Sequence, residues 1–423
     1  MRSMVSLTHD AREPPELRTN SGRLGVGIRR DGTGRVLTTS TAATVSTTVA
    51  YQGLVIAVEA SDSGALDWLE EFLAPAFARS DARSARYRVV LVDDAEAYAN
   101  LVERTAGLAS TPTRCFALDR GFATFPSWTL PGGERVVLDG DSRVLYLVDP
   151  DGVRIRIVAD RPLSPRRISL MRVVRELVMG QAWATSGLVV HGAALALGET
   201  GVMIAGPKGA GKTSLLLHLL FHAPGACFVS NDRVVVEFDA TPRLRGLPTV
   251  VTVRTHTLSL YPELEPRLAR RQYDVRLLSG ETSDAPIVTR ANSDARLIVA
   301  PAQLCEILGV AMRGSVTAGV LLLPQLAPDD DGARLTPVSS RVAADALKAC
   351  VIGGEPAPAT SDVFGASSRG HQPVDREELD RRLLAFTEGV RCFECRLGRH
   401  AYGREAAGGL LELLADGEDG RRL

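Results

Sequence analysis

The chain has 423 residues, a formal net charge of −1, 45% hydrophobic residues and 23% charged residues. This length allows two or three domains with a substantial core, and the composition is that of an ordinary soluble globular protein. With almost no net charge, the chain has no global field that would draw it to nucleic acid or to a membrane surface. We therefore expect neither among its partners.

The cysteine count and the apolar runs predict a cytoplasmic location. Six cysteines are scattered along the chain, which is few for this length and favours reduced thiols. The N-terminus has no apolar stretch typical of a signal peptide, and no uninterrupted apolar run reaches about 18 residues.

Three regions follow one another in the sequence. Residues 1–47 are rich in Ser, Thr, Arg and Gly, show no period and are predicted to be a disordered tail. Residues 48–165 predict a small α+β accessory domain, with a helix over 65–77 and strands over 53–58, 87–92, 135–138, 143–148 and 153–158. Asp93 and Asp94 end one of these strands, as an acidic turn or, less simply, as a metal-binding pair.

Residues 166–415 predict a larger second domain of the α/β class. A helix over 167–184 leads into a strand over 188–197, and a turn at 198–201 returns the chain as a second apolar strand. Residues 255–296 are polar and irregular, as in a mobile segment that faces a substrate. Further on we predict helices over 301–308, 338–350, 375–387 and 401–414, strands over 319–323 and 390–397, and a linker over 353–372.

The central motif is a phosphate-binding loop between the second strand and a predicted helix. It reads Gly206-Pro207-Lys208-Gly209-Ala210-Gly211-Lys212-Thr213, followed by Ser214, and fits G-x-x-x-x-G-K-[ST]. Its glycines leave backbone N–H groups free to cradle phosphates at a helix N-terminus. Lys212 is predicted to reach the β- and γ-phosphates of ATP, and the Thr213 hydroxyl to ligate Mg²⁺.

The lysine at this position is notable because the chain contains only three lysines, Lys208, Lys212 and Lys348, among 49 basic residues. An arginine-rich chain that keeps lysine here indicates a need for a compact ammonium, since a planar guanidinium does not replace that point charge.

A second chemical element lies twenty residues beyond Lys212. A mostly apolar run ends near Asp232, which predicts a strand adjacent to the phosphate-loop strand that delivers a carboxylate to the same sheet edge. A carboxylate there can hold Mg²⁺ or accept the proton of an attacking hydroxyl. The alternative is an ordinary Asn-Asp turn at a strand end.

These residues together resemble the HPr kinase/phosphorylase family and its HprK-like relatives. The resemblance rests on His191-Gly192, the loop, and Ser230-Asn231-Asp232-Arg233-Val234, and covers roughly residues 185–255. It implies a phosphoenolpyruvate-carboxykinase-like P-loop sheet, ATP and Mg²⁺ as cofactors, Asp232 as general base, and His191 as a histidine near the phosphate site. For His191, a buried structural histidine stays the alternative.

The chain departs from that family at two places. Asn231 stands where the family has a first Asp, so metal and proton roles are redistributed. The family's bifunctional members carry a Glu before Arg-Gly-Leu-Gly, whereas this chain has Leu244-Arg245-Gly246-Leu247-Pro248 close to Asp232. We therefore do not expect reverse phosphorylase activity, while Arg245 and Arg254 remain candidate phosphate or substrate contacts.

The leading hypothesis is an ATP-dependent kinase that transfers the γ-phosphate to a Ser-type hydroxyl of a protein or peptide; a small metabolite stays open as acceptor. The alternative is a nucleotide-binding regulatory protein without phosphoryl transfer, and a decarboxylating carboxykinase is a third. Cys392, Cys395 and His400 resemble a metal knuckle, but a strand would turn the two cysteines to opposite sides. The oligomeric state, a homo-oligomer included, stays open.

Overall fold

A computed structural model describes residues 27–30, 36–39, 44–81, 84–117, 121–160, 165–184, 187–238, 241–264, 296–352, 364, 375–403 and 410–412. The chain divides into two compact units, Met1–Ala43 and Thr44–Leu423. In the first unit, β1 (Gly27–Arg30) and β2 (Val36–Thr39) form an antiparallel pair. The region predicted as a tail, residues 1–47, therefore contains these two strands and the start of β3 (Val45–Tyr51). Its other residues up to Ala43 lie outside the described ones.

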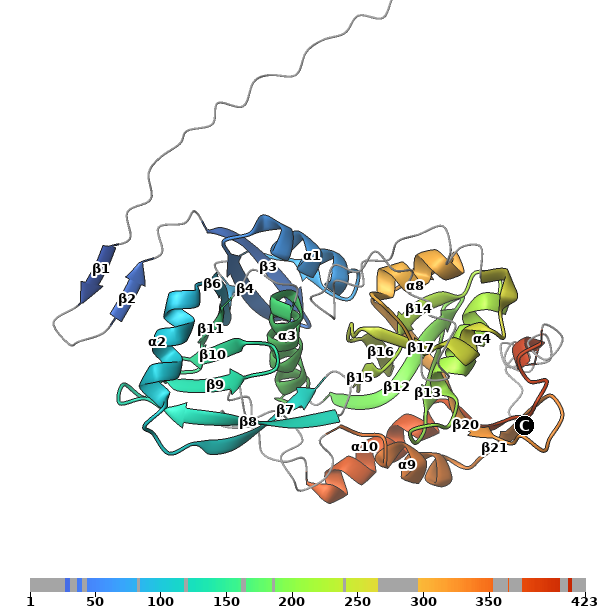
Figure 1. Ribbon diagram of the computed structural model, residues 1–423. Coiled ribbons are helices and arrows are strands. Elements are labelled where there is room, and N and C mark those ends of the chain that lie inside the picture. Colours follow the sequence, from blue (N-terminus) through green and yellow to red (C-terminus); the bar gives the residue numbers. More distant parts are fainter. Residues whose placement is uncertain are drawn as a thin grey trace, which may run out of the picture. The chain divides into compact units, whose positions relative to one another are not determined.

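The second unit begins with a mixed sheet of nine described strands in the order β5-β3-β4-β6-β11-β10-β9-β8-β7 (Figure 1). These strands are β3 (Val45–Tyr51), β4 (Leu54–Ala60), β5 (Ala78–Arg79), β6 (Tyr87–Asp93), β7 (Thr111–Ala117), β8 (Gly121–Thr129), β9 (Arg135–Asp139), β10 (Val144–Val148) and β11 (Arg154–Ala159). Strand β6 pairs in parallel with β4 and β11, and the other pairs are antiparallel.

Two helices follow strands of this sheet, α1 (Ser63–Leu73) and α2 (Ala95–Thr105). Each begins after an aspartate that caps it: Asp62 accepts from the N–H of Gly64, and Asp94 accepts from that of Ala97 at 2.9 Å. Asp94 is thus a helix cap, which agrees with the turn reading of the Asp93-Asp94 pair. The sequence pattern did not predict α2, β3, β5, β7 or β8.

Helix α3 (Pro165–Ala184) leads into a second mixed sheet, again of nine described strands. They are β12 (Leu188–Leu197), β13 (Thr200–Ala205), β14 (Cys227–Ser230), β15 (Arg233–Glu237), β16 (Arg243–Gly246), β19 (Ala311–Met312), β20 (Ser315–Leu326), β21 (Ala333–Pro337) and β22 (Arg391–Leu397). Strands β17 (Val251–Arg254) and β18 (Arg296–Val299) form a separate antiparallel pair.

The position of β12 corrects one prediction. Strand β13, which leads into the phosphate-binding loop, pairs with β12 on one side and with β20 on the other. Strand β14, which leads to Asp232, pairs with β12 and not with β13. The predicted adjacency of the two strands is therefore wrong, because the Gly198–Glu199 turn folds β12 back against β13 and fills that place. Since β12 is antiparallel to both, β13 and β14 still run in the same direction.

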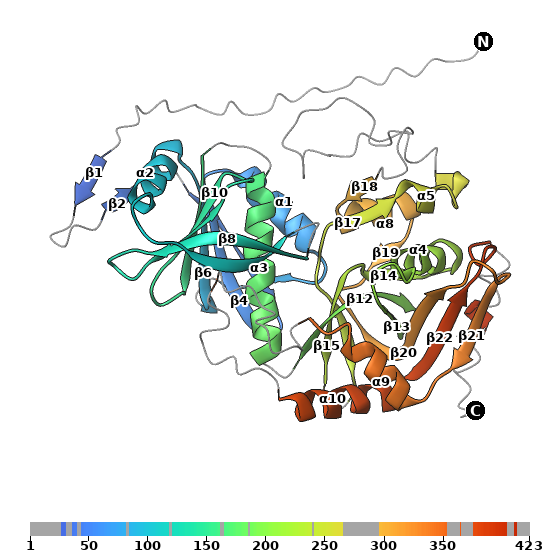
Figure 2. The same ribbon diagram turned by 60° about the horizontal axis from the view of Figure 1, so that its bottom comes forward.

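Helices cover both faces of this sheet. Helix α4 (Lys212–His222) and α8 (Pro301–Leu308) share a core with one face, while α9 (Ser340–Lys348) and α10 (Arg376–Glu388) pack on the other (Figure 2). Short turns of helix, α5 (Thr255–Leu258) and η2 (Pro262–Leu264), follow β17. One core cluster runs from the first sheet through α3 into the second sheet, so α3 belongs to both.

The later elements match the sequence predictions with shifted ends. Strand β20 is longer than the predicted 319–323, because it begins at Ser315 and continues past Pro324 to Leu326. A helix was predicted over 401–414. Residues 401–403 form a turn, and residues 410–412 are helical. The other residues of this predicted helix lie outside the described ones. Most of the predicted mobile segment 255–296 and of the linker 353–372 also lies outside them.

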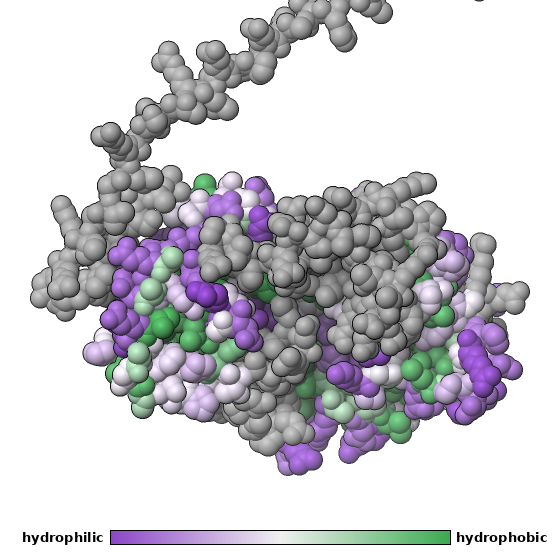
Figure 3. Space-filling model, viewed as in Figure 1, coloured by the Kyte–Doolittle hydropathy of each residue, from purple (hydrophilic) through white to green (hydrophobic). Residues whose placement is uncertain are grey.

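Among the described residues, no helix is both long enough and apolar enough to cross a membrane. On the face seen in Figure 3, hydrophobic residues form only small groups between hydrophilic ones.

Candidate active site

The loop at residues 206–211 connects β13 to α4 and has the backbone that the motif requires. Gly209 and Gly211 have φ values of +87° and +98°, which L side chains rarely adopt. A Cβ atom on Gly211 would also lie 3.1 Å from Leu326 Cδ2, so the loop packs tightly against the end of β20. Within the described residues, no side chain caps the first turn of α4, which leaves its N–H groups available to an anion.

Lys212 begins α4 and turns its side chain back into the loop. Its Nζ donates to the carbonyl oxygens of Gly206 at 2.7 Å and Pro207 at 3.0 Å, and the residue is buried. Burial lowers the pKa of Lys212, while the nearby Cys350 thiol and Asp232 carboxylate oppose that shift. Asp232 is thus close enough to act electrostatically on the loop lysine.

The remaining loop residues lie where a polyphosphate could reach them. Pro207, Lys208 and Gly209 are exposed at the tip of the loop, and Ala210 N–H donates to the carbonyl of Pro207 at 3.2 Å. Thr213 and Ser214 are half-buried in the first turn of α4.

Asp232 lies in the tight turn between β14 and β15, beside the middle of β12. The Ser230 hydroxyl donates to the carbonyl of Arg233 at 2.6 Å and closes the turn. The N–H of Gly192 donates to the Asp232 carbonyl at 3.0 Å and fixes the turn to β12. The place of the carboxylate is therefore set by backbone contacts on both sides.

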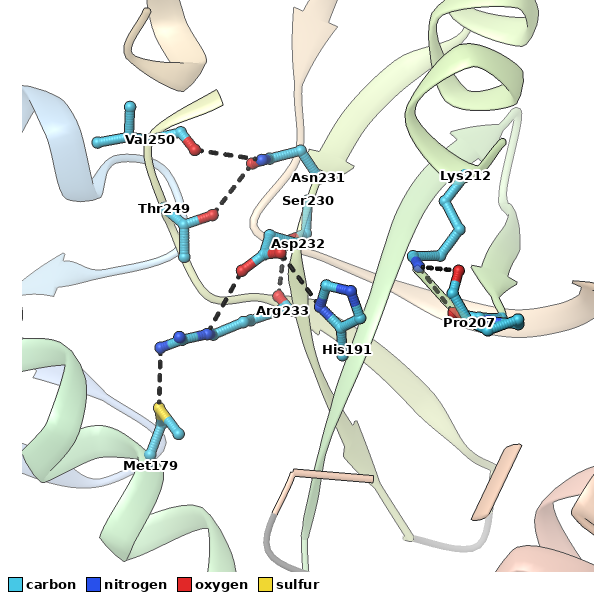
Figure 4. A network of polar contacts seen from close by, with 11 residues as sticks. Met179, His191, Pro207, Lys212, Ser230, Asn231, Asp232, Arg233, Thr249 and Val250 are labelled. Atoms are coloured by element: carbon cyan, nitrogen blue, oxygen red, sulfur yellow. Dashed lines mark hydrogen bonds and ion pairs between the residues drawn. The ribbon is translucent and has the colours of Figure 1, made fainter. Parts of the chain in front are cut away.

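The Asp232 carboxylate has a partner at each oxygen. His191 Nδ1 lies 3.1 Å from Oδ1, and Arg233 Nε lies 3.4 Å from Oδ2. Because a carboxylate can only accept, Nδ1 carries the proton of this bond. Figure 4 shows the His191 ring, in that view, between Asp232 and the Lys212 side chain. About 42% of the His191 side chain and 36% of the Asp232 side chain are exposed, so both can be reached from solvent.

The surroundings keep Asp232 ionised. Burial by itself would raise the pKa of Asp232, but the hydrogen bond from His191 and the charges of Arg233 and Arg175 lower it to about 2. A carboxylate in this state can hold a cation or accept hydrogen bonds at any physiological pH.

Asn231 turns away from this pair. Its Nδ2 donates to the carbonyl of Val250 at 3.4 Å, and its Oδ1 accepts from the Thr249 hydroxyl at 3.3 Å (Figure 4). The amide thus ties the turn to the segment before β17.

A Mg²⁺ ion fits the side chains that are present. The Thr213 hydroxyl and the Asp232 carboxylate are hard oxygen ligands, and Mg²⁺ is commonly bound by one or two carboxylates together with substrate phosphates and water. Among the described residues, no group of three or more His, Cys, Asp or Glu side chains is placed to hold a metal. The oxygen set therefore suits a nucleotide-bound ion better than a metal held by protein alone.

Several other candidates lie outside the site. Arg245 Nε donates to Glu237 at 2.6 Å, and its guanidinium lies over the Tyr51 ring. Arg254 is exposed at the end of β17. Cys392 and Cys395 face different core clusters across β22, as the strand pattern predicted, and burial raises their pKa values to about 11 and about 12.

The sequence analysis gave no role to Arg175 on α3 or to Arg233. Both side chains are buried, at 2% and 7% exposure. The available signal was the group of charged residues Arg172, Arg175 and Glu176 among the apolar residues in the middle of the helix; all three are buried.

Comparisons with known proteins give little support beyond this geometry. The sequence matches no known protein family, and no curated protein matches it. Among solved structures, the HPr(Ser) kinase/phosphatase from Coxiella burnetii aligns with 54% of this chain and 90% of its own, at 11% identity and a TM-score of 0.23. A TM-score of this size is too low to establish a shared fold.

Proposed function

We propose that the chain is an ATP-dependent kinase that transfers the γ-phosphate to a Ser-type hydroxyl of a protein or peptide. The observation that carries the proposal is the placement of two features around β12. A loop with a buried lysine follows β13, and Asp232, paired with His191 of β12, follows β14, which runs in the same direction. Ligands of open α/β sheets bind beyond the ends of such strands.

In this proposal the loop and α4 bind the phosphates of ATP. Backbone N–H groups of residues 206–213 and the α4 N-terminus contact the α- and β-phosphates, and the Lys212 ammonium leaves the loop carbonyls for the β- and γ-phosphates. Mg²⁺, held by Thr213 and Asp232, would offset the charge that develops on the transferred group.

Asp232 orients the acceptor hydroxyl and receives its proton. A pKa of about 2 makes this carboxylate a weak base. Phosphoryl transfer through a loose transition state needs little proton abstraction before the bond to phosphorus forms, so positioning matters more than basicity. His191 fixes the carboxylate through Nδ1 and keeps Oδ1 turned towards the middle of β12.

Labelled ATP tests the proposal directly. The protein is incubated with γ-³²P-ATP, Mg²⁺ and an array of serine-containing peptides and proteins from its gene neighbourhood. We expect transfer by the wild type, a loss of about 100-fold or more in Lys212→Ala and Asp232→Asn, and little change in Lys348→Ala. Lys348 is a matched control because it pairs with Asp380 on α10, outside the site. Equal transfer by wild type and Asp232→Asn would contradict the assigned role.

One observation favours a second candidate, a nucleotide-binding regulatory protein without transfer. Both Asp232 oxygens already have partners, and Asn231 is engaged with residues 249–250. Calorimetry with ATP and with ADP separates the two candidates. Stoichiometric ATP binding that Lys212→Ala abolishes, with no transfer to any acceptor or to water, would support the regulator and reject the kinase.

A further inference from the structure

The strongest feature outside the described chemistry is a line of buried side chains on α3 behind Asp232. Met171, Arg175 and Met179 lie four residues apart, so they share one face of the helix. The exposed fraction of Arg175 is 2%, and its Nη1 lies 3.8 Å from the Met171 sulfur. Within the described residues, Arg175 Nε and Nη2 have no hydrogen-bond partner.

Arg233 joins this line to the site. Its Nη1 lies 3.4 Å from the Met179 sulfur, and its Nε lies 3.4 Å from Asp232 Oδ2. Figure 4 shows the resulting series Met179, Arg233, Asp232 and His191 as one connected path from α3 to β12. Two buried guanidinium groups, those of Arg175 and Arg233, thus repel each other, with the carboxylates of Glu176 and Asp232 nearby.

This arrangement lowers the stability of the fold, which indicates that the charges serve another purpose. A buried charge without full hydrogen bonding costs several kcal/mol, and an apolar residue of similar size would avoid that cost. The neighbouring Arg172 differs, because its Nη1 donates to Asp139 at 2.9 Å and to the Tyr146 hydroxyl at 3.1 Å in the first sheet. Arg172 therefore has a structural partner of its own, whereas the guanidinium of Arg175 contacts a sulfur.

We propose that Arg175 is a positioning residue for the Asp232–His191 pair. Its fixed positive charge repels the Arg233 guanidinium, which rests on Met179 of α3, and holds that guanidinium against Asp232 Oδ2. With Oδ2 held, Oδ1 faces the His191 Nδ1–H in one orientation. Arg172, Glu176, Arg233 and Asp232 are the charged groups that act on Arg175. The inference rests on the proposed function for its kinetic consequence, but the orientation of His191 can be measured without any activity.

The test compares Arg175→Met, Arg175→Lys and Arg172→Met in the full chain. Arg172→Met is the matched control, because it removes an equally buried arginine three residues away on the same helix. Three quantities are measured: the ring ¹⁵N resonances of His191, the affinity for Mg·ADP, and the rate of γ-phosphate transfer from ATP to peptide or water. Because the chain has seven histidines, the His191 resonances are assigned by their loss in His191→Gln.

We expect Arg175→Met to shift the His191 ring resonances and to lower transfer by about 10- to 100-fold, since a displacement near 1 Å can cost about that much. Affinity for Mg·ADP should stay within about twofold, because the phosphate loop is unchanged. Arg175→Lys should restore most of the transfer and the wild-type resonances. Arg172→Met should lower stability but leave the His191 resonances in place.

The inference is overturned if Arg175→Met leaves the His191 resonances unchanged, or if Arg172→Met moves them equally. If the wild type binds Mg·ADP but transfers no phosphate, the proposed function fails, and the His191 resonances still decide the role of Arg175.

Discussion

At the scale of single residues, the site depends on a close approach between β12 and β13. A Cβ atom on Gly192 would lie only 2.8 Å from the Ile204 carbonyl oxygen, in the strand that leads into the loop. The glycine therefore lets β12 lie against β13 while the preceding residue, His191, contacts Asp232. The pair His191-Gly192 combines a polar contact with a steric requirement.

Substitution of this glycine should destabilise the protein. We expect Gly192→Ala to lower the free energy of unfolding by about 1–3 kcal/mol, as overpacking of a tight contact usually does. Gly140→Ala is the control, because no atom lies within 4 Å of its added Cβ, and its effect should stay within about 0.5 kcal/mol. Urea unfolding of the two variants gives both values, and equal midpoints would refute the steric argument.

The charge environment of Asp232 predicts a pH dependence of stability. Its folded-state pKa of about 2 lies below the ordinary value of 3.8, so the ionised carboxylate stabilises the folded protein. This contribution is complete above about pH 5 and is lost as the pH falls through 3.8 towards 2. Between pH 5 and pH 3, the urea midpoint of the wild type should fall more steeply than that of Asp232→Asn. Parallel curves would show that the folded and unfolded pKa values are equal.

At the scale of elements, the apolar period predicted most helices but not their first residues, because the caps were not identified from the sequence. Helix α1 was found from its apolar spacing, and Asp62 caps it. Helix α2 lies outside the predicted elements, although its apolar residues Tyr98, Leu101 and Val102 recur at helical spacing and Asp94 precedes it. Removal of the Asp94 side chain therefore distinguishes a capping role from the metal-pair alternative for Asp93-Asp94.

Removal of this cap should weaken α2 without any effect of metal. We expect Asp94→Ala to cost about 1 kcal/mol, because the Ala97 N–H loses its acceptor, and Asp94→Asn to retain most of the stability. The measurement is urea unfolding with and without EDTA. A change in the midpoint on addition of EDTA, seen in the wild type and absent in Asp94→Ala, would favour a metal role instead.

The strand–loop–helix arrangement around residues 206–211 was the element most fully determined by sequence. Its glycines, lysine and threonine act through backbone geometry at one strand–helix junction, so spacing alone predicts their arrangement. Strand pairing was less predictable. The sequence placed Asp232 at a strand end, but it could not show that β12 lies between β13 and β14, because pairing depends on contacts far apart in the chain.

At the scale of the whole second unit, the two sheets share one continuous core. Buried residues of both sheets and of α3, among them Val58, Val174 and Val235, belong to one cluster. A division at residue 165 into separately stable parts would expose the apolar surface of α3. We therefore expect the two sheets to unfold together.

The three tryptophans make this expectation measurable. Trp68, Trp128 and Trp183 all precede β12, so their fluorescence reports the first sheet and α3, whereas far-UV circular dichroism reports both sheets. The two signals should give one urea midpoint, and saturating Mg·ATP should raise the tryptophan midpoint although the loop lies in the second sheet. Two separate transitions would show independent domains.

The sequence by itself determined the elements whose physics is local: the glycine-rich loop between β13 and α4, the helices and strands with clear periods, and the opposite facing of Cys392 and Cys395. The tertiary structure decided what depends on distant partners. It placed β12 between β13 and β14, brought His191 to Asp232, turned Asn231 towards residues 249–250, and buried Arg175 on α3. A side chain's type fixes what it can bond to, but only the packed fold decides which groups come within reach of it.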